Sequence, residues 1–354
     1  MDRRIDETAS AGNARIVLRR RPGGLPTAND FALEQAPVPE PRDGEALVRT
    51  LLVSVDPAMR HWVNQGSGYA EPVATGDVMR SFGVGEVVRS RTAEYAPGDI
   101  VLGMTGWQEW ATLGAAGVLG AVDPRLGPLS TALGVLGING LTAYVGMLDI
   151  CRPKAGETAV VSTAAGAVGS AAGQLAAVRG ARVIGLAGSA EKCRLSVEEF
   201  GFDACIDYRA VADLGAALDM HCPEGIDVFF DSVGGAQLDA VLQRIQVGAR
   251  IAICGTIGLP VGEIGEGPRI ERTLLVKRAL IQGFLVTDHL DRRAAMVDEL
   301  ATYVRAGTLR YREDVATSLT DAPRALERLL AGENAGKSIV RVAEPPEGVL
   351  VTAG

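Results

Sequence analysis

The sequence predicts an α/β protein with two parts, a doubly wound parallel sheet and a mostly β part. From about residue 136 to 310, strand-like apolar runs alternate with helical runs, which is typical of βαβ units around a parallel sheet. From about residue 14 to 125, the apolar segments are short and separated by Gly and Pro, which favours β-strands. A run of small residues follows the first strand of the alternating part, where a glycine-rich turn is expected.

In the mostly β part, the clearest strand-like segments are "EALVRTLLVSV" (45–55), "GVGEVVRS" (83–90) and "GDIVLGMTGWQEWATL" (98–113). The next stretch, 126–150, carries little charge and is long enough to suggest a membrane span. It contains Pro128, Asn139 and several glycines, which argue against one continuous spanning helix. We therefore predict a loop followed by a buried helix.

The alternating part predicts five strands and four helices. The strands are expected at 158–162, 181–187, 204–208, 226–233 and 249–255, and the helices at 167–179, 190–200, 210–220 and 235–245. Near the end of the chain, a helical segment at 321–333 and a strand-like one at 337–343 form one more βαβ-sized piece that could return to the first part. We therefore expect a tail at 1–13, one domain from 14–135 and 311–354, and a second domain at 136–310.

Composition excludes several classes of protein. Residues 158–178 are uncharged, and Gly169 and Gly173 match a helix-packing GxxxG, but the stretch is rich in Ala and Gly, which gain little from lipid. With 22% charged residues and 47% hydrophobic ones, the chain is soluble in character. Its net charge of −8 and pI near 5.1 argue against a nucleic-acid or anionic-membrane surface.

The chain also predicts a reducing, cytoplasmic location. The first fourteen residues lack the apolar core that a secretory signal needs. The five cysteines are an odd number and are scattered along the chain, so reduced thiols are expected.

The small residues after the first strand of the alternating part match a dinucleotide-binding turn. Ala164, Gly166 and Gly169 stand where G-x-G-x-x-G would stand. Small residues are needed there because the turn is tight, the backbone approaches a pyrophosphate, and the helix packs on its strand. The helix N-terminus then offers free N–H groups to the phosphates. Tight helix packing alone would also use Ala and Gly, so the preceding strand and the following βαβ series are needed to favour binding.

The end of the second strand indicates which dinucleotide is bound. An NAD site has an acid there that accepts from the ribose hydroxyls, whereas this strand ends "VIGLAGSAEK", with no acid before Glu191. Ser189, Lys192 and, from the next strand end, Tyr208 could donate to a 2′-phosphate, which favours NADPH. The alternative for Lys192 is a solvated helix lysine.

Ordered motifs along residues 14 to 342 resemble one family. The chain resembles the zinc-independent medium-chain dehydrogenase/reductase superfamily, and within it the leukotriene B4 dehydrogenase, prostaglandin reductase and curcumin reductase group of NADPH-dependent double-bond reductases. The resemblance implies a GroES-like β-barrel domain built from both ends of the chain, a central Rossmann domain, a substrate in the cleft, and a homodimer. The matching segments are "SVDPAMR" (54–60), "GDVMRSFGVGEVV" (76–88), "GDIVLGMTGWQEWA" (98–111), "GINGLTAYVGMLDI" (137–150), "AAGAVGS" (164–170), "FFDSVGG" (229–235), "IAICGTI" (251–257), "IQGFLV" (281–286) and "ENAGKSIV" (333–340).

The resemblance also assigns cofactor contacts by position. It places Lys192 and Tyr208 at the 2′-phosphate. Cys254 lies in a strand-like apolar run and is expected to be a packed, inert thiol. The implied pyrophosphate contacts are Gly166, Ala167, Val168 and Gly169, and the implied nicotinamide neighbours are Cys254, Thr256, Phe284, Leu285, Val286 and Asn334.

Three positions depart from the family pattern. The family's "DNVG" reads "DSVG" here, so that Ser232 replaces an amide that can contact the cofactor. "SVDPYMR" reads "SVDPAMR", with Ala58 in place of a tyrosine that lines the substrate cleft, and Val276 stands where prostaglandin reductases have another tyrosine. Asp56 and Arg60 are expected to support the substrate cleft through a salt bridge. The lost rings put the family's usual substrate in doubt.

The residues do not predict a zinc site. Up to residue 125 the chain has no cysteine and only His61, and "GVGE" stands where a zinc relative has Gly-His-Glu. His221 and His289 are remote in the sequence. We therefore expect a metal-free site.

A metal-free NADPH site favours conjugate reduction over direct carbonyl reduction. Hydride addition to the β-carbon of an apolar α,β-unsaturated ketone or aldehyde spreads charge onto the enolate oxygen, which a cofactor hydroxyl or a nearby donor can hold. The proton could come from water or from a tyrosine, and Tyr69 is the tyrosine that we nominate, with a rim or core role as its alternative. A quinone reductase or pathway-specific reductase of the same fold, and a non-catalytic NADP-binding paralogue, remain alternatives.

Overall fold

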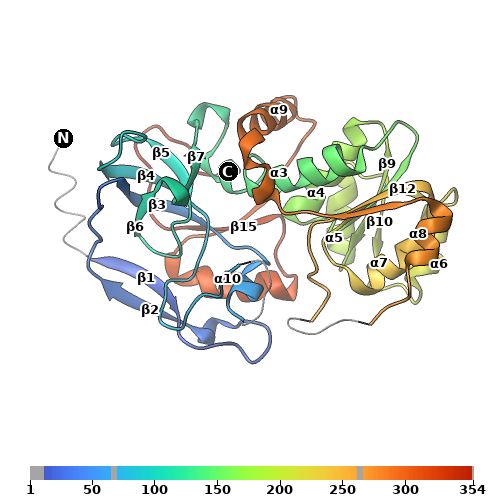
Figure 1. Cartoon of the computed structure of the whole chain (residues 1–354), viewed down its shortest axis with the longest axis horizontal. Helices are drawn as coiled ribbons and strands as arrows, with labels where there is room; N and C mark the ends of the chain where they lie inside the picture. The colour runs from blue at the N-terminus through green and yellow to red at the C-terminus, as the bar shows by residue number, and fades with distance from the viewer. Residues whose placement is uncertain (1–11, 65–69, 261–265, 353–354) are drawn as a thin grey trace. The chain divides into compact units, whose positions relative to one another are not determined.

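The computed structural model describes residues 12–64, 70–260 and 266–352, which belong to two compact units. The β unit comprises Met1–Leu133 together with Glu313–Gly354, and the α/β unit comprises Gly134–Arg312. Figure 1 traces the chain through both units. Each unit has its own sheet and is described separately below.

The α/β unit contains a six-stranded sheet in which every neighbouring pair is parallel. Its strands are β8 (Thr158–Ser162), β9 (Arg182–Ala187), β10 (Ala204–Asp207), β11 (Ile226–Asp231), β12 (Ile245–Ile253) and β13 (Leu280–Gly283). Their order across the sheet, β10-β9-β8-β11-β12-β13, is 3-2-1-4-5-6 when the strands are numbered along the unit. This is the Rossmann order, in which ligands bind where the order reverses, between β8 and β11. The predicted fold class is confirmed.

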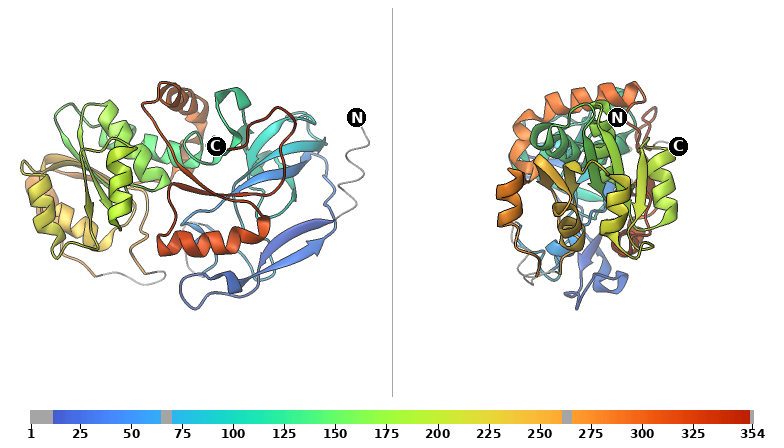
Figure 2. Two further views of the ribbon diagram at one scale, coloured as in Figure 1. Left: turned by 180° about the vertical axis from the view of Figure 1, so that it is seen from behind. Right: turned by 90° about the vertical axis from the view of Figure 1, so that its right-hand side faces the viewer.

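Helices lie on both sides of these strands (Figure 2). The apolar cluster that includes Val160, Ile184 and Ile206 packs against Leu218 and Val241, from two helices on one face of the sheet. Neighbouring residues of the strands point to the opposite face, where Gly185 adjoins Ala164 and Cys205. The helices are α3 (Ile138–Tyr144), α4 (Ala167–Val178), α5 (Ala190–Glu198), α6 (Leu214–His221), α7 (Gly235–Leu242), α8 (Glu271–Lys277) and α9 (Arg293–Arg305).

Most predicted helices and strands of the α/β unit are present, with corrections. The strand expected at 249–255 begins at Ile245, and the sixth strand, β13, was not predicted. The helix expected at 210–220 begins at Leu214, because the Asp213 carboxylate accepts hydrogen bonds from the Gly215 and Ala216 N–H groups (2.7 and 3.2 Å) and caps it. The helix expected at 235–245 ends at Leu242, because Ile245 already pairs with Ile226 as the first residue of β12.

The stretch at 126–150 contains the predicted buried helix. A short 3₁₀ helix (Leu129–Leu133) precedes α3, and a π-helical segment (Val145–Cys151) continues it. Among the described residues, no helix is both long and apolar enough to cross a membrane.

The GxxxG pair on α4 serves packing within the α/β unit. A Cβ on Gly173 would lie 2.0 Å from the Cζ atom of Phe202, and one on Gly169 would lie 2.3 Å from the carbonyl oxygen of Thr163. Both glycines are therefore required by close approach inside the fold rather than by a second helix in lipid.

The β unit is organised around the ten-residue strand β3 (Glu45–Ser54). The first half of β3 pairs with β6 (Trp110–Gly114), and its end pairs with β15 (Lys337–Arg341). On its other edge, β3 pairs with β4 (Gly83–Ser90) along most of the length of β3. The order of the main sheet is β14-β15-β3-β4-β5-β7. The remaining strands are β1 (Asn13–Leu18), β2 (Phe31–Ala36), β5 (Ile100–Gly103), β7 (Val118–Ala121) and β14 (Glu313–Ala316).

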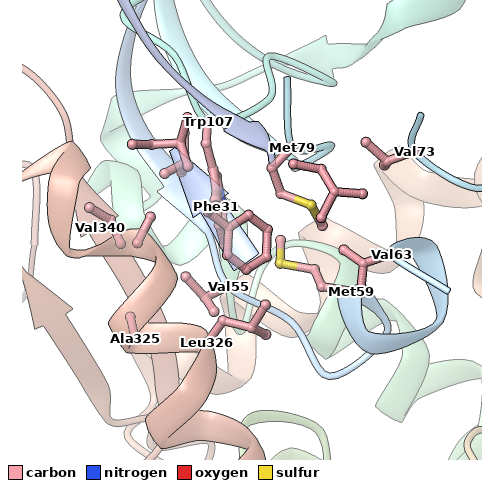
Figure 3. Close-up of a cluster of buried hydrophobic side chains, with 14 of the residues drawn as sticks. Phe31, Val55, Met59, Val63, Val73, Met79, Trp107, Ala325, Leu326 and Val340 are labelled. Carbon is pink, nitrogen blue, oxygen red and sulfur yellow. The ribbon is translucent and has the colours of Figure 1, made fainter. Parts of the chain in front are cut away.

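The end of the chain returns to the β unit, as the sequence suggested. The strands β14 and β15 are parallel and are connected through α10 (Ala322–Ala331), which contacts β15 (Figure 1). Leu326 of α10 packs in a core with Phe31, Met59 and Trp107 (Figure 3). This core also packs against α2 (Met59–Trp62). Of the predicted substrate residues, Ala58 is the N-cap of α2 and Arg60 lies in its first turn.

Candidate active site

The glycine turn follows β8 at the point where the strand order reverses. Thr163 adopts a left-handed backbone (φ 52°), the Gly166 N–H donates to the Thr163 carbonyl at 2.7 Å, and α4 begins at Ala167. Gly166 is the N-cap, and no side chain caps the helix. The first N–H groups of an α-helix have no partner within it, so those of Ala167, Val168 and Gly169 are available to an anion.

A second group of polar side chains lies at the carboxyl ends of β9 and β10. A Cβ on Gly188 would lie 3.0 Å from the Tyr208 hydroxyl and 3.2 Å from Nε of Arg209, so both side chains lie close to the turn after β9. The Arg209 guanidinium lies 5.8 Å from the centre of the Tyr208 ring. The pKa of Lys192 is lowered, first by burial and then by the charge of Arg209. Two cations and a phenol therefore gather here.

Ser189 has a structural role at this position. Its hydroxyl oxygen accepts a hydrogen bond from the Lys192 N–H at 3.2 Å and caps α5. This cap sets the direction of the first turn of α5, which carries Lys192. Ser189 is therefore a capping residue. Its hydroxyl oxygen accepts from the backbone, and its hydroxyl proton can still be donated to a ligand.

The loop after β11 brings the next two strand ends together. The buried Asp231 carboxylate accepts from the Val233 and Gly234 N–H groups (2.8 and 3.0 Å), and burial raises its pKa. The Ser232 hydroxyl lies 3.2 Å from Sγ of Cys254, which follows β12. Burial raises the pKa of the Cys254 thiol to about 12, so it stays protonated at neutral pH. Ser232 thus contacts a thiol, where the family's amide would offer a longer side chain.

The other predicted nicotinamide neighbours of the α/β unit follow β12 and β13. The Phe284 ring packs against the segment 145–151: a Cβ on Gly146 would lie 2.9 Å from its Cζ atom. Thr256 and Leu285 are exposed, and Val286 begins a 3₁₀ helix that ends at Arg292. All follow the carboxyl ends of parallel strands, the edge at which Rossmann sheets bind ligands. Val276, in contrast, lies on α8 with 56% of its surface exposed.

In the β unit, Asp56 is held by Lys337, a residue that the sequence analysis did not single out. The Lys337 ammonium donates to Asp56 Oδ1 at 2.6 Å, to Ser54 Oγ at 2.5 Å and to the Val55 carbonyl at 3.1 Å. The Ser54 hydroxyl also donates to Asp56. Both side chains of the ion pair are largely buried, with 5% and 16% of their surface exposed. Asp56 therefore forms its salt bridge with Lys337 of β15, and not with Arg60, which the sequence analysis named beside it.

The remaining predicted residues of the β unit lie around α2 and before β15. The Arg60 side chain is buried, its Nε donates to His61 Nε2 at 3.3 Å, and burial lowers its pKa. The Ala58 methyl packs against the core of Figure 3. Asn334 is buried and its amide donates to the Gly336 carbonyl at 2.9 Å. Tyr69 lies outside the described residues.

Comparison with known proteins identifies the family. Residues 14–120 match the N-terminal domain of oxidoreductases and residues 167–302 match the zinc-binding dehydrogenase model. A Bacillus subtilis protein named as an NADP-dependent oxidoreductase, YfmJ, is 44% identical over 95% of this chain and 99% of its own. The chain belongs to the zinc-independent medium-chain reductase family.

Two further members of this family cover nearly the whole chain. The NADP-dependent 2-alkenal reductase of Nicotiana tabacum is 38% identical over 94% of this chain and 98% of its own. The solved structure of CurA from Vibrio vulnificus in complex with NADPH superposes with a TM-score of 0.87, at 41% identity over 94% of this chain and all of that one.

The donor set of this reductase does not fit a zinc ion, although one family model is described as zinc-binding. In the described part of the chain, no three His, Cys, Asp or Glu side chains are grouped so that they could hold a metal ion. His61, the histidine nearest the predicted substrate residues, is next to the Arg60 cation, which together with burial lowers its pKa. No step of the reaction is therefore assigned to a metal.

Two residues of this reductase site were missed from the sequence. Arg209 directly follows Tyr208, so a second cation at the end of β10 was visible, but nothing local placed it beside Lys192. Lys337 is the first residue of the strand-like segment 337–343, directly before an apolar run, and nothing local showed that its side chain is buried against Asp56.

Proposed function

We propose that this chain reduces the C=C bond of α,β-unsaturated ketones or aldehydes with NADPH and without a metal ion. The observation that carries the proposal is the arrangement at the Rossmann switch point. The N-terminus of α4, which no side chain caps, suits a pyrophosphate. The Lys192 and Arg209 cations near the ends of β9 and β10 suit a 2′-phosphate. The names of the relatives, an NADP-dependent oxidoreductase and a 2-alkenal reductase, support the same cofactor and substrate class.

In this proposal the α/β unit holds NADPH along one edge of its sheet. The glycine turn and the first turn of α4 bind the pyrophosphate, while Lys192, Arg209 and Tyr208 bind the 2′-phosphate. Ser232, Cys254 and Phe284, with Thr256, Leu285 and Val286, are assigned to the nicotinamide end. Asn334 is assigned there by the resemblance. When bound, NADPH supplies a hydride that adds to the β-carbon of the substrate.

The residues favour an alkene over a carbonyl as the group reduced. Direct carbonyl reduction places full charge on one oxygen, and in the described ranges 12–64, 70–260 and 266–352 no group of three metal-ligating side chains is present to stabilise it. Conjugate reduction spreads the charge over an enolate, so one hydrogen-bond donor is sufficient. We assign the α-carbon proton to Tyr69 or to water. Ala58 and Val276 replace tyrosines that the resemblance places at the substrate, so this chain's substrate is expected to differ from that of the prostaglandin reductases.

The test is oxidation of NADPH in the presence of a small panel of 2-alkenals, enones and quinones. With NADPH deuterated at C4, the proposal expects deuterium at the β-carbon of a saturated ketone or aldehyde. Hydroquinone formation with no enone turnover would replace the proposal by the quinone reductase alternative. Binding of NADPH without any turnover would favour a non-catalytic paralogue.

The same assay examines the proton donor. Tyr69→Phe should lower turnover more than it weakens NADPH binding, because the hydroxyl is assigned to proton transfer and not to the cofactor. Equal turnover would leave water as the donor. Assembly as a homodimer and a cytoplasmic location stay predictions from the resemblance and from the unpaired cysteines.

A further inference from the structure

The buried ion pair of the β unit joins two stretches of chain to which the proposed function assigns different parts of the reaction. Lys337 is the first residue of β15, and Asn334, assigned to the nicotinamide end, lies three residues before it. Asp56 lies between β3 and α2, and Ala58, assigned to the substrate, is the N-cap of α2. The function proposed above gives Lys337 no role.

The Lys337 ammonium uses all three of its donors on three consecutive residues. It donates to Ser54 Oγ at 2.5 Å, to the Val55 carbonyl at 3.1 Å and to Asp56 Oδ1 at 2.6 Å. The next residue of β15 adds a further bond, because the Ser338 carbonyl accepts from the Val55 N–H at 3.1 Å. The start of β15 therefore holds the chain at the point where it leaves β3.

The chain held in this way leads directly into the single turn of α2. The Asp56 carbonyl accepts from the Met59 N–H at 3.0 Å, and the Ala58 carbonyl accepts from the His61 N–H at 2.9 Å. Because α2 has four residues and no capping side chain, its own hydrogen bonds are too few to fix its direction. Its direction depends on the apolar core around Met59 and on the anchor at Asp56.

The chain before Lys337 is fixed by its own hydrogen bond. The buried Asn334 amide donates to the Gly336 carbonyl at 2.9 Å, and Gly336 has a left-handed backbone (φ 80°), so that a tight turn leads into β15. A short, hydrogen-bonded path therefore runs from Asn334 through the ion pair to the start of α2, entirely within the β unit.

We propose that Lys337 is a positioning residue, which fixes the substrate segment 54–60 relative to Asn334 and so places an α,β-unsaturated substrate for hydride transfer. The inference rests on the proposed function, because that function assigns Asn334 and Ala58 to the cofactor and the substrate. Lys337 acts only through the residues that it holds. A displacement of about 1 Å between reacting groups costs about a hundredfold in rate, so a loosened segment should slow the reaction.

This role explains why the buried pair is charged. Two apolar side chains of similar size could supply comparable stability, because a buried ion pair loses much of its attraction to desolvation. Apolar contacts are non-directional, whereas the bonds of the ammonium to Ser54, Val55 and Asp56 each require a defined distance and angle. An apolar replacement should therefore preserve the fold of the β unit and lose the direction of the substrate segment.

The test uses the full-length double variant Lys337→Met with Asp56→Leu, under conditions in which tryptophan fluorescence shows that it is folded. Hydrogen–deuterium exchange should show a loss of protection at the Met59 and His61 amides, with the rest of the β unit protected as in the parent. The kcat/KM for a 2-alkenal should fall about ten- to a hundredfold. The dissociation constant of NADPH should hardly change, because its phosphates are assigned to the α/β unit.

A kinetic isotope effect adds a readout that a loss of stability alone would not move. With NADPH deuterated at C4, the isotope effect on kcat should be larger in the double variant than in the parent, because misplacement slows hydride transfer and leaves product release unchanged.

The matched control is Arg91→Met with Asp43→Leu, which removes an exposed ion pair of the same unit and should change neither exchange nor turnover. A folded Lys337→Met, Asp56→Leu variant with the turnover of the parent would overturn the proposal, because the pair would then only stabilise the fold. If the parent itself reduces no enone, the proposed function fails and the exchange measurement decides alone. Lost protection at Met59 would then keep Lys337 as the residue that holds the segment, and unchanged protection would refute it.

Discussion

Replacing Lys337 by Met should destabilise the β unit far more than the loss of a surface charge. The methionine keeps the length of the side chain and removes its charge, so that the carboxylate of Asp56 is left without its cation. That carboxylate has 16% of its surface exposed, so water can replace the ammonium only in part. Removing one partner of a buried ion pair costs about 3–5 kcal/mol.

The three tryptophans offer a probe of this unit alone. They are Trp62, Trp107 and Trp110, all in the β unit, and the indole N–H of Trp107 donates to the Ser54 carbonyl at 3.2 Å, directly beside the ion pair. Urea unfolding followed by tryptophan fluorescence therefore reports on the unit that the mutation affects. With a slope of about 2 kcal/mol per molar urea, Lys337→Met should lower the midpoint by about 2 M.

Two further variants make the result specific. Arg91→Met breaks the exposed pair with Asp43 in the same unit, where 61% and 99% of the side chains are exposed, and should cost less than about 1 kcal/mol. The double variant Lys337→Met with Asp56→Leu removes both charges and should be more stable than Lys337→Met alone. If Lys337→Met and Arg91→Met lower the free energy of unfolding by the same amount, the buried pair of Lys337 and Asp56 does not stabilise the β unit more than an exposed pair does.

Two predictions concern the α/β unit. Lys192→Ala and Arg209→Ala should each weaken NADPH binding about ten- to a hundredfold, since one charged hydrogen bond contributes about 1.5–3 kcal/mol, and should leave NADH binding nearly unchanged. The dissociation constants of both cofactors at low and high salt check this, and equal weakening of NADH would contradict it. Gly173→Ala should destabilise the unit by about 1–3 kcal/mol because its Cβ would lie 2.0 Å from the Phe202 ring, with Phe202→Leu restoring part of the loss. Thermal unfolding followed by circular dichroism measures this loss of stability. Gly283→Ala is the control, because a Cβ at that position has no atom within 4 Å. A similar loss of stability in both variants would show that the Phe202 ring moves aside at little cost.

Local patterns in the sequence were sufficient for the architecture of the α/β unit. A strand, a turn of small residues and a helix are encoded by neighbouring residues, because side-chain periodicity and turn chemistry act over a few positions. The turn at Gly166 and Gly169 and the absence of an acid after β9 were visible for this reason. The start of α6 and the end of α7 were misplaced by a few residues, because a capping side chain at Asp213 and a strand pair at Ile245 decided them.

Only the tertiary structure decided which side chains meet. Lys337 and Asp56 are 281 residues apart in the sequence and form one buried pair, because β15 is placed beside the end of β3. Arg209 lies near Lys192 because β10 pairs with β9 and α5 packs over both. Ser232 contacts Cys254 because β11 and β12 end at the same edge. The sequence specifies each strand through its own residues, but a contact between two strands depends on the register and order of the sheet, which arise only when the whole unit packs.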